Sequence, residues 1–139
     1  MKQLFLTALL LVIVKLGVGQ FWQNAADIVP NEKYDNIHVQ KVHTSEQVSS
    51  FVIWVKNEVK PHLHGNHVEH VYVIEGYGTM LLGDKIKQVK AGDIIAIPPN
   101  VIHAVKTLSK TPLKVISIQA PEFFNKDRNY VESENWPPK

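Results

Sequence analysis

The sequence predicts an all-β fold of many short strands, arranged as a sandwich or a barrel. Runs of β-branched and aromatic residues recur along the chain and are bounded by Gly, Pro, Asn and Asp, which is typical of strands and turns. Beyond the N-terminal apolar run, no stretch keeps the apolar spacing of a helix over a helical length. The length of 139 residues is enough for one domain with a short appendage, and too little for two ordinary domains.

Each expected strand is an apolar or β-branched run between turn residues. Gly83-Asp84 separates two of these runs and predicts a hairpin turn, because glycine supplies the positive φ that such a turn needs. Pro98-Pro99-Asn100 and Thr111-Pro112 predict two further corners. The strands are expected at Ile37–Val42, Ser49–Val55, Val68–Glu75, Thr79–Leu82, Lys85–Val89, Asp93–Ile97, His103–Thr107 and Leu113–Gln119.

Composition excludes several classes of function. Hydrophobic residues make up 45% and charged residues 20% of the chain, a balance typical of a packed globular protein. The net charge of +2 comes without a basic run, so nothing favours a nucleic-acid partner. The chain has no cysteine, which excludes disulfides, thiolate metal sites and thiol nucleophiles.

The N-terminal residues 1–19 resemble a secretory signal peptide. Lys2 is followed by a short apolar run from Leu4 to Val14 and then by small residues at Gly17 and Gly19. The run is too short for a membrane helix, although a retained signal anchor is the alternative. We therefore expect cleavage after Gly19 and a periplasmic or secreted protein that does not span the membrane once processed.

The remaining chain divides into three parts. We expect an N-terminal arm and first strand over residues 20–48, a barrel over 49–119 and a C-terminal extension over 120–139.

A cluster of histidines is the strongest indication of a functional site in the sequence. Five of the seven histidines lie between His62 and His103. His62 and His64 project from the same face if the segment is extended, and Glu69 at the start of the next strand can reach back toward them. His103 offers a third nitrogen after the Pro98 corner. Although an isolated histidine is more often a surface or core residue, this set would suit Fe, Mn, Ni, Cu or Zn.

Here the sequence resembles the cupin superfamily, whose two motifs are G(X)5HXH(X)3–4E(X)6G and G(X)5PXG(X)2H(X)3N. The resemblance covers about residues 49–119. The first motif is matched at His62, His64, Glu69 and Gly76, and the second at Gly92, Pro98 and His103. Three positions depart from the motifs: Lys56 and Asn100 replace glycines, and Thr107 replaces the final asparagine. Asn100 is a mild change, because asparagine tolerates the left-handed conformation of glycine.

The resemblance implies a double-stranded β-helix, or jelly roll, with one divalent transition metal between its two sheets. It also implies that His62, His64, Glu69 and His103 are the metal ligands. The motifs do not specify which metal is bound or which reaction is catalysed.

Several residues near the motifs have two interpretations each. His67 is either a partner of the ligands or, more commonly for a loop, an exposed histidine. Arg128 is either a carboxylate- or phosphate-binding group or a surface residue paired with Asp127 or Glu122. Trp54 is either core or pocket wall. His70 and Tyr72 are expected to point outward, Gln119 into the barrel mouth, Phe123 and Phe124 over the barrel end, and His38 and His43 into solvent.

Two functions follow from this reading. The first is a metal-dependent enzyme of dioxygenase, isomerase or lyase type acting on a small molecule, with no catalytic residue identified beyond the ligands. The alternative is a non-catalytic module that binds or senses a small ligand. Exposed edge strands also make a homodimer an expectation, with the Phe51–Val55 run serving as core or as interface.

Overall fold

A computed structural model describes residues 23–137 of the chain, and the predicted signal peptide (1–19) lies outside the described residues. The described residues form an all-β fold of ten strands, which confirms the predicted class. The strands are β1 (Ile37–Ser45), β2 (Val48–Val55), β3 (Glu58–Leu63), β4 (Val68–Glu75), β5 (Tyr77–Leu82), β6 (Lys85–Lys90), β7 (Ile94–Ile97), β8 (His103–Thr107), β9 (Leu113–Ala120) and β10 (Asn129–Tyr130). No described segment forms a helix of the length and apolarity that crossing a membrane requires.

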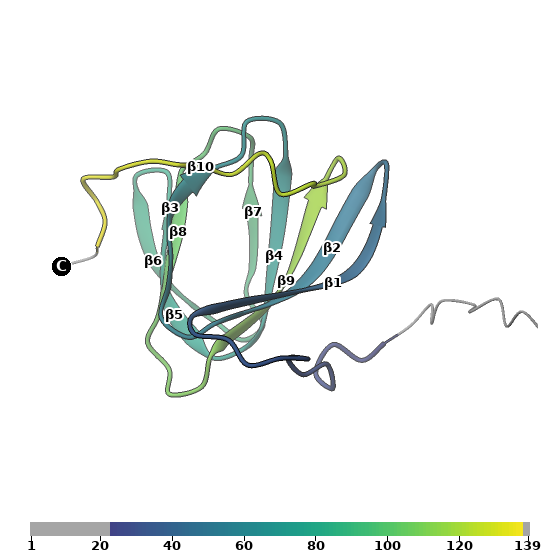
Figure 1. Cartoon of the computed structure of the whole chain (residues 1–139). Helices are drawn as coiled ribbons and strands as arrows, with labels where there is room; N and C mark the ends of the chain where they lie inside the picture. The colour runs from purple at the N-terminus through teal and green to yellow at the C-terminus, as the bar shows by residue number, and fades with distance from the viewer. Residues whose placement is uncertain (1–22, 138–139) are drawn as a thin grey trace, which may run out of the picture.

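The strands pair into two five-stranded antiparallel sheets. One sheet has the order β1-β2-β9-β4-β7 and the other the order β10-β3-β8-β5-β6. Figure 1 shows the sheets facing one another, so that the chain alternates between them in the manner of a jelly roll. Their inner faces enclose the core, to which Val55, Val73, Ile97, Leu113 and Val115 contribute buried side chains.

Two strands were not expected from the sequence. Strand β3 contains Lys60 and Pro61 and has a register shift between Val59 and His62, so it lacks a clean apolar alternation. Strand β10 has two residues, and it forms because β3 offers it a free edge. The other strands agree with the predicted segments, with ends that differ by up to a few residues.

Two turn residues have the left-handed backbone that the motif positions require. Asn100 has a φ of 64° where the cupin motif has glycine, so the substitution keeps the conformation. Gly76 has a φ of 80°, and a Cβ there would meet the backbone of Pro112 and Leu113 at 3.0 and 3.1 Å. A side chain at position 76 would therefore strain the turn between β4 and β5.

The run from Phe51 to Val55 packs as core on both faces of its sheet. Val55 points toward the barrel interior, whereas Trp54 is buried on the other face, which makes Trp54 core and not pocket wall. His38, expected in solvent, is also buried there, with its ring 5.5 Å from the Trp54 ring and 5.4 Å from the Tyr34 ring. That expectation was wrong, because the arm preceding β1 contributes Tyr34 to this packing.

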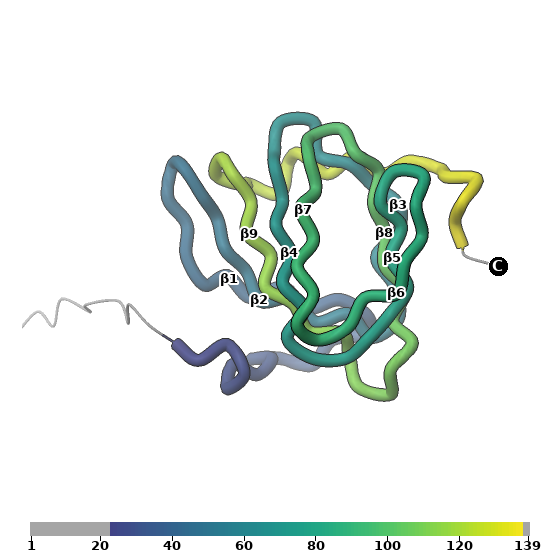
Figure 2. Tube along the Cα trace, turned by 180° about the vertical axis from the view of Figure 1, so that it is seen from behind, coloured from purple at the N-terminus to yellow at the C-terminus, as the bar shows by residue number. Residues whose placement is uncertain are grey.

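The N-terminal arm (residues 23–36) and the C-terminal segment (residues 121–130) lie at opposite ends of the barrel (Figures 1 and 2). Lys114 at the start of β9 anchors the arm, because its Nζ donates to the carbonyl oxygens of Ala26 and Ile28 at 2.9 and 2.7 Å. The C-terminal segment crosses the other end before it joins β3 through β10.

Candidate metal centre

The barrel brings the four predicted ligands together at the end crossed by the C-terminal segment. His62 lies near the end of β3, and His103, the first residue of β8, is its cross-strand partner. His64 follows β3 directly. Glu69 comes from β4 in the opposite sheet, so the cluster joins the two sheets. We call these four residues the ligand cluster.

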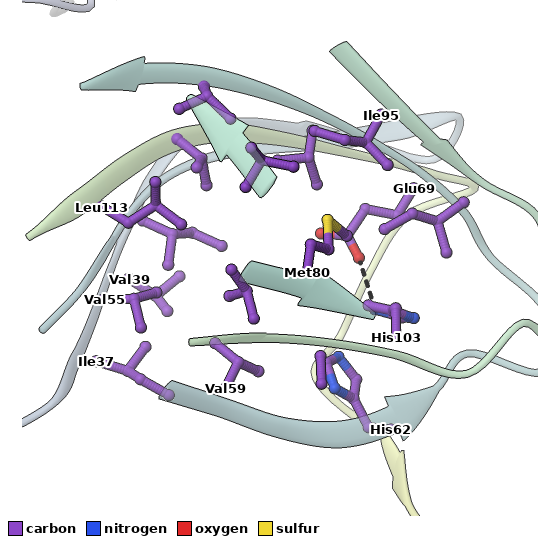
Figure 3. Close-up of a pocket in the computed structure, with 18 of the residues that line it drawn as sticks. Ile37, Val39, Val55, Val59, His62, Glu69, Met80, Ile95, His103 and Leu113 are labelled. Atoms are coloured by element: carbon purple, nitrogen blue, oxygen red, sulfur yellow. Dashed lines mark ion pairs between the residues drawn. The ribbon is translucent and has the colours of Figure 1, made fainter. Parts of the chain in front are cut away.

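The donor atoms of the ligand cluster converge in a buried space. One nitrogen from each of His62, His64 and His103 lies within 4.8 Å of the others, an arrangement that could hold a metal ion. The Oε2 atom of Glu69 lies 3.3 Å from Nε2 of His64 and 3.3 Å from Nε2 of His103. Figure 3 shows Glu69 facing His103 across the space, with His62 beside them. All four side chains are buried.

Backbone carbonyls fix the tautomer of each histidine. Nδ1 of His62 lies 2.9 Å from the Lys60 carbonyl oxygen, Nδ1 of His103 lies 3.0 Å from that of Val101, and Nδ1 of His64 lies 2.5 Å from that of Asp127. A carbonyl oxygen can only accept, so each Nδ1 carries the proton and donates it. Nε2 is therefore the ring nitrogen of each histidine that is left to bind a metal.

Polar neighbours hold Glu69 in its ionised form. The Ser117 hydroxyl donates to Oε1 at 2.5 Å, and the Gln119 amide nitrogen lies 3.5 Å from the same oxygen. Burial alone would raise the pKa of the carboxyl, but its contacts with His103, His64 and Ser117 outweigh burial and hold the pKa below its ordinary value. Gln119 points into the barrel, as the sequence predicted.

Burial keeps His62 neutral. Loss of solvation, the neighbouring His103 and the positive charge of Arg128 lower the pKa of His62 to about 3. At neutral pH, its imidazole is therefore free of the proton that would block a metal.

The ligand cluster fits a cation. Nε2 of His64 and of His103 is buried without a hydrogen-bond partner, and each lies 3.3 Å from Oε2 of Glu69. Ring nitrogens packed this closely around a carboxylate are stabilised by a positive charge among them, which a metal ion would supply. Nitrogen and oxygen donors of this kind suit a divalent transition metal. That all four residues bind one ion remains a prediction.

Asp127 in the C-terminal segment holds the ligand loop in place. Its carboxylate accepts hydrogen bonds from the backbone nitrogens of Gly65 and Asn66 at 3.0 and 2.8 Å and from Nδ1 of His67 at 2.6 Å. Its own carbonyl accepts from His64. Although desolvation opposes the effect, these donors lower the pKa of the Asp127 carboxyl to about 2. Asp127 thus orients a predicted ligand from sixty-three positions along the chain.

His67 was expected in solvent, and that expectation was wrong. The side chain is buried, because Asp127 faces one ring nitrogen and the Glu122 carbonyl lies 3.0 Å from the other. The outward directions of His70, Tyr72 and His43 agree with the predictions, since all three are exposed.

The two phenylalanines at the barrel end differ from each other. The Phe123 ring is buried against His64 and His67, with ring centroids 5.3 and 5.1 Å apart. Phe124 is 66% exposed, so the expectation that both cover the barrel was wrong for Phe124. Adjacent residues of an extended segment point to opposite sides, and only one can face the barrel.

An apolar cavity of about 80 Å³ runs from the ligand cluster into the barrel. Figure 3 shows Glu69, His62 and His103 at one end of the cavity and Leu113, Val55 and Ile37 toward the other. Its walls are formed by apolar side chains and by four polar ones, which are His62, Glu69, His103 and Arg128.

Arg128 lines this cavity instead of pairing on the surface. Its guanidinium forms no ion pair with a carboxylate of the described residues, because Asp127 bonds to the ligand loop and the Glu122 carboxylate accepts from Thr44. The expected pairing with Asp127 or Glu122 was therefore wrong. The sequence could not show this, since the neighbours of Arg128 come from distant strands.

Comparison with known proteins agrees with this architecture. A family model described as a cupin domain matches residues 50–119. The chain belongs to the cupin family.

Two of the curated relatives that match this cupin illustrate the range of the similarity. An uncharacterized protein of Methanocaldococcus jannaschii is 29% identical over 87 residues, which cover 63% of this chain and 70% of that protein. The mannose-1-phosphate guanylyltransferase RfbM of Salmonella typhimurium is 34% identical over 65 residues, which cover 47% of this chain and 14% of the enzyme. The second match therefore concerns a small part of that enzyme.

A solved structure matches more of the cupin. An uncharacterized conserved protein with a double-stranded β-helix domain from Klebsiella pneumoniae superposes with a TM-score of 0.70 at 20% identity. The match covers 82% of this chain and 99% of that protein. At this identity the likeness concerns the fold, which confirms the predicted jelly roll.

Proposed function

We propose that this cupin is an exported, metal-dependent enzyme of dioxygenase, isomerase or lyase type that acts on a small molecule. The observation that carries the proposal is the convergence of three histidine nitrogens and the Glu69 carboxylate on an apolar cavity. Export follows from the signal peptide predicted for residues 1–19, with cleavage after Gly19, and stays a prediction.

The chain's own residues divide the work at the site. His62, His64 and His103 would hold the ion through Nε2, and Glu69 through its carboxylate. A bound divalent ion supplies polarisation of a substrate carbonyl or a lowered pKa of water. The apolar walls exclude bulk water, which strengthens every charge interaction inside the cavity.

The cavity walls favour chemistry that needs no side-chain nucleophile. Among the described residues that line the cavity there is no serine, threonine, lysine or tyrosine. Outside the ligand cluster, the one charged group is Arg128. This lining supports a metal-dependent reaction, and the lack of a second acid or base also favours the alternative, a module that binds a small ligand without converting it.

Metal content tests the first part of the proposal. The protein is purified without chelators or nickel resin, and metals are measured by plasma mass spectrometry in the wild type, His62→Ala, His103→Ala and the exposed control His43→Ala. We expect about one equivalent of a transition metal in the wild type and in His43→Ala, and loss in the other two. A wild type that stays metal-free after anaerobic reconstitution would overturn the proposal.

Turnover separates the enzyme from the module. The metal-loaded protein is incubated with a panel of small molecules, and oxygen consumption and substrate change are followed. Conversion of any compound that His103→Ala does not convert supports the enzyme. Saturable binding without conversion across the panel would favour the module.

A further inference from the structure

Arg128 lies at the junction of two hollows. It lines the apolar cavity at the ligand cluster and also an adjoining groove formed in part by Val39, Lys41 and Gln119. Its guanidinium carbon lies 5.8 Å from the centre of the Phe123 ring, which packs against the ligand His64. The buried Phe123 ring therefore links Arg128 to the candidate metal centre.

The arginine has no anionic partner within the described part of the chain. Its Nε is buried without a hydrogen-bond partner, and no described carboxylate forms an ion pair with it. The side chain is partly exposed, but a buried N–H donor that finds no acceptor is costly. An arginine kept in this state at the wall of a cavity indicates that a ligand supplies the acceptor.

The charge balance of the cavity favours an anion. Among the described residues that line the cavity, Glu69 is the one carboxylate and Arg128 the one guanidinium. A divalent ion on the ligand cluster would leave the cavity positive overall. An anionic ligand would compensate this charge in a medium where interactions are stronger than in water.

The cavity walls determine the polarity and size of the rest of the ligand. Apart from the ligand cluster and Arg128, the lining is apolar and comes from Val, Ile, Leu, Met and Ala side chains. A cavity of roughly 150 Å³ is enough to hold a benzene ring. The cavity of about 80 Å³ would therefore admit an aliphatic chain of a few carbon atoms, and not a sugar ring.

We propose that the substrate of this site is a short aliphatic carboxylate, bound through its carboxylate by Arg128 with its chain in the apolar cavity. The planar fork of one guanidinium matches the two oxygens of one carboxylate. A phosphate group would need more donors than this apolar lining offers. This inference rests on the proposed function, since it names the substrate class of the same site.

Calorimetry tests the charge preference directly. Butanoate, the uncharged butanamide and inorganic phosphate are titrated into the metal-loaded wild type, Arg128→Met, Arg128→Lys and Lys41→Met. Lys41→Met removes an exposed cation of the adjoining groove and is the matched control. Metal content is measured on every sample.

We expect the wild type and Lys41→Met to bind butanoate about 10- to 100-fold more tightly than butanamide. Arg128→Met should lose this preference, and Arg128→Lys should keep part of it, because lysine retains the charge without the fork. Equal butanoate affinity in the wild type and Arg128→Met, or tighter binding of phosphate than of butanoate, would overturn the inference.

The design keeps the two proposals distinguishable. If the wild type holds metal but shows no preference that depends on Arg128, the substrate class is wrong and the metal centre stands. If the wild type holds no metal, the proposed function fails. Butanoate binding that depends on Arg128 in the metal-free protein would still support a carboxylate site.

Discussion

The segments that precede and follow the main strands of the barrel differ in the residues that they contact. The N-terminal arm and the C-terminal segment are both irregular, and they lie at opposite ends of the barrel. The arm is held by Lys114, whose ammonium donates to two of its backbone carbonyls. The C-terminal segment is held by Asp127, which binds the loop of the predicted ligand His64.

The difference teaches that a segment's role depends on the partner it reaches and not on its own composition. The arm packs Tyr34 against His38, whose ring lies beside Trp54, so its contacts contribute to stability. The C-terminal segment places Asp127 and Arg128 side by side, one on the ligand loop and one in the cavity. Three measurements would sharpen or break this contrast.

Acid should have the largest effect, and it should act at the ligand cluster. The pKa of His62 is about 3 in the folded protein, against 6.5 for the unperturbed side chain. Between these values the unfolded chain binds a proton that the folded protein does not, so stability is complete above pH 6.5 and falls with acidification. For the metal-free protein we expect His62 to cost about 1.4 kcal/mol of unfolding free energy per pH unit, or about 3 kcal/mol by pH 4.

Denaturant unfolding at a series of pH values measures this slope. The slope should be smaller by that amount in His62→Gln, which is neutral throughout, and unchanged in His43→Gln, which alters an exposed histidine. Equal slopes in the wild type and His62→Gln would show that burial does not hold this imidazole neutral. The arm should stay docked, because its bonds to Lys114 involve neither a carboxyl nor an imidazole group.

Replacing Asp127 should weaken the metal site without unfolding the barrel. Asp127→Asn keeps the shape but turns an NH₂ group toward donors that need an acceptor. We expect metal affinity to fall about 10- to 100-fold, as is usual when a group that orients a ligand is lost. Competition with a chromophoric chelator measures the affinity.

Asp93→Asn is the matched control for this variant. Asp93 also accepts from a backbone nitrogen, that of Lys90, but does so on the surface away from the ligand cluster. Unchanged metal affinity in Asp127→Asn would mean that the carboxylate does not position His64.

Replacing Lys114 should have the smallest effect, and it should be limited to stability. Lys114→Met leaves two arm carbonyls without their donor and should lower the unfolding free energy by about 1 to 2 kcal/mol. Chemical denaturation measures this change, with the exposed Lys110→Met as control. Metal affinity should be that of the wild type, and a loss comparable to that of Asp127→Asn would erase the distinction between the two segments.

The fold and the convergence of the ligand cluster could be predicted because their signals are local. The His62-x-His64 pair, Glu69 and His103 stand at motif spacings, and the turn at Asn100 has a residue that tolerates its backbone. Alternating strands then bring the four together without any information from the rest of the chain.

Three of the wrong expectations concern the partners of polar side chains, and a fourth, for Phe124, concerns which of two adjacent side chains faces the barrel. His38 and His67 are buried by Tyr34 and Asp127, and Arg128 faces the cavity because its two acidic neighbours bond elsewhere. No local pattern encodes such pairings, since a polar residue looks exposed until its partner is known. Strand β3 was missed for a related reason. Lys60 and Pro61 interrupt its apolar pattern, and its pairing with β8, in which His62 lies opposite His103, is not visible in the local sequence.

The shortness of β10 has a consequence for how fast an ion could come and go. Its ladder with β3 consists of Asn129 with Leu63 and Tyr130 with His62, so the C-terminal segment has little regular pairing to lose. Segments of this kind open locally at a lower free energy than the whole fold. The residence time of a bound ion would then follow the opening rate of the last part of the chain.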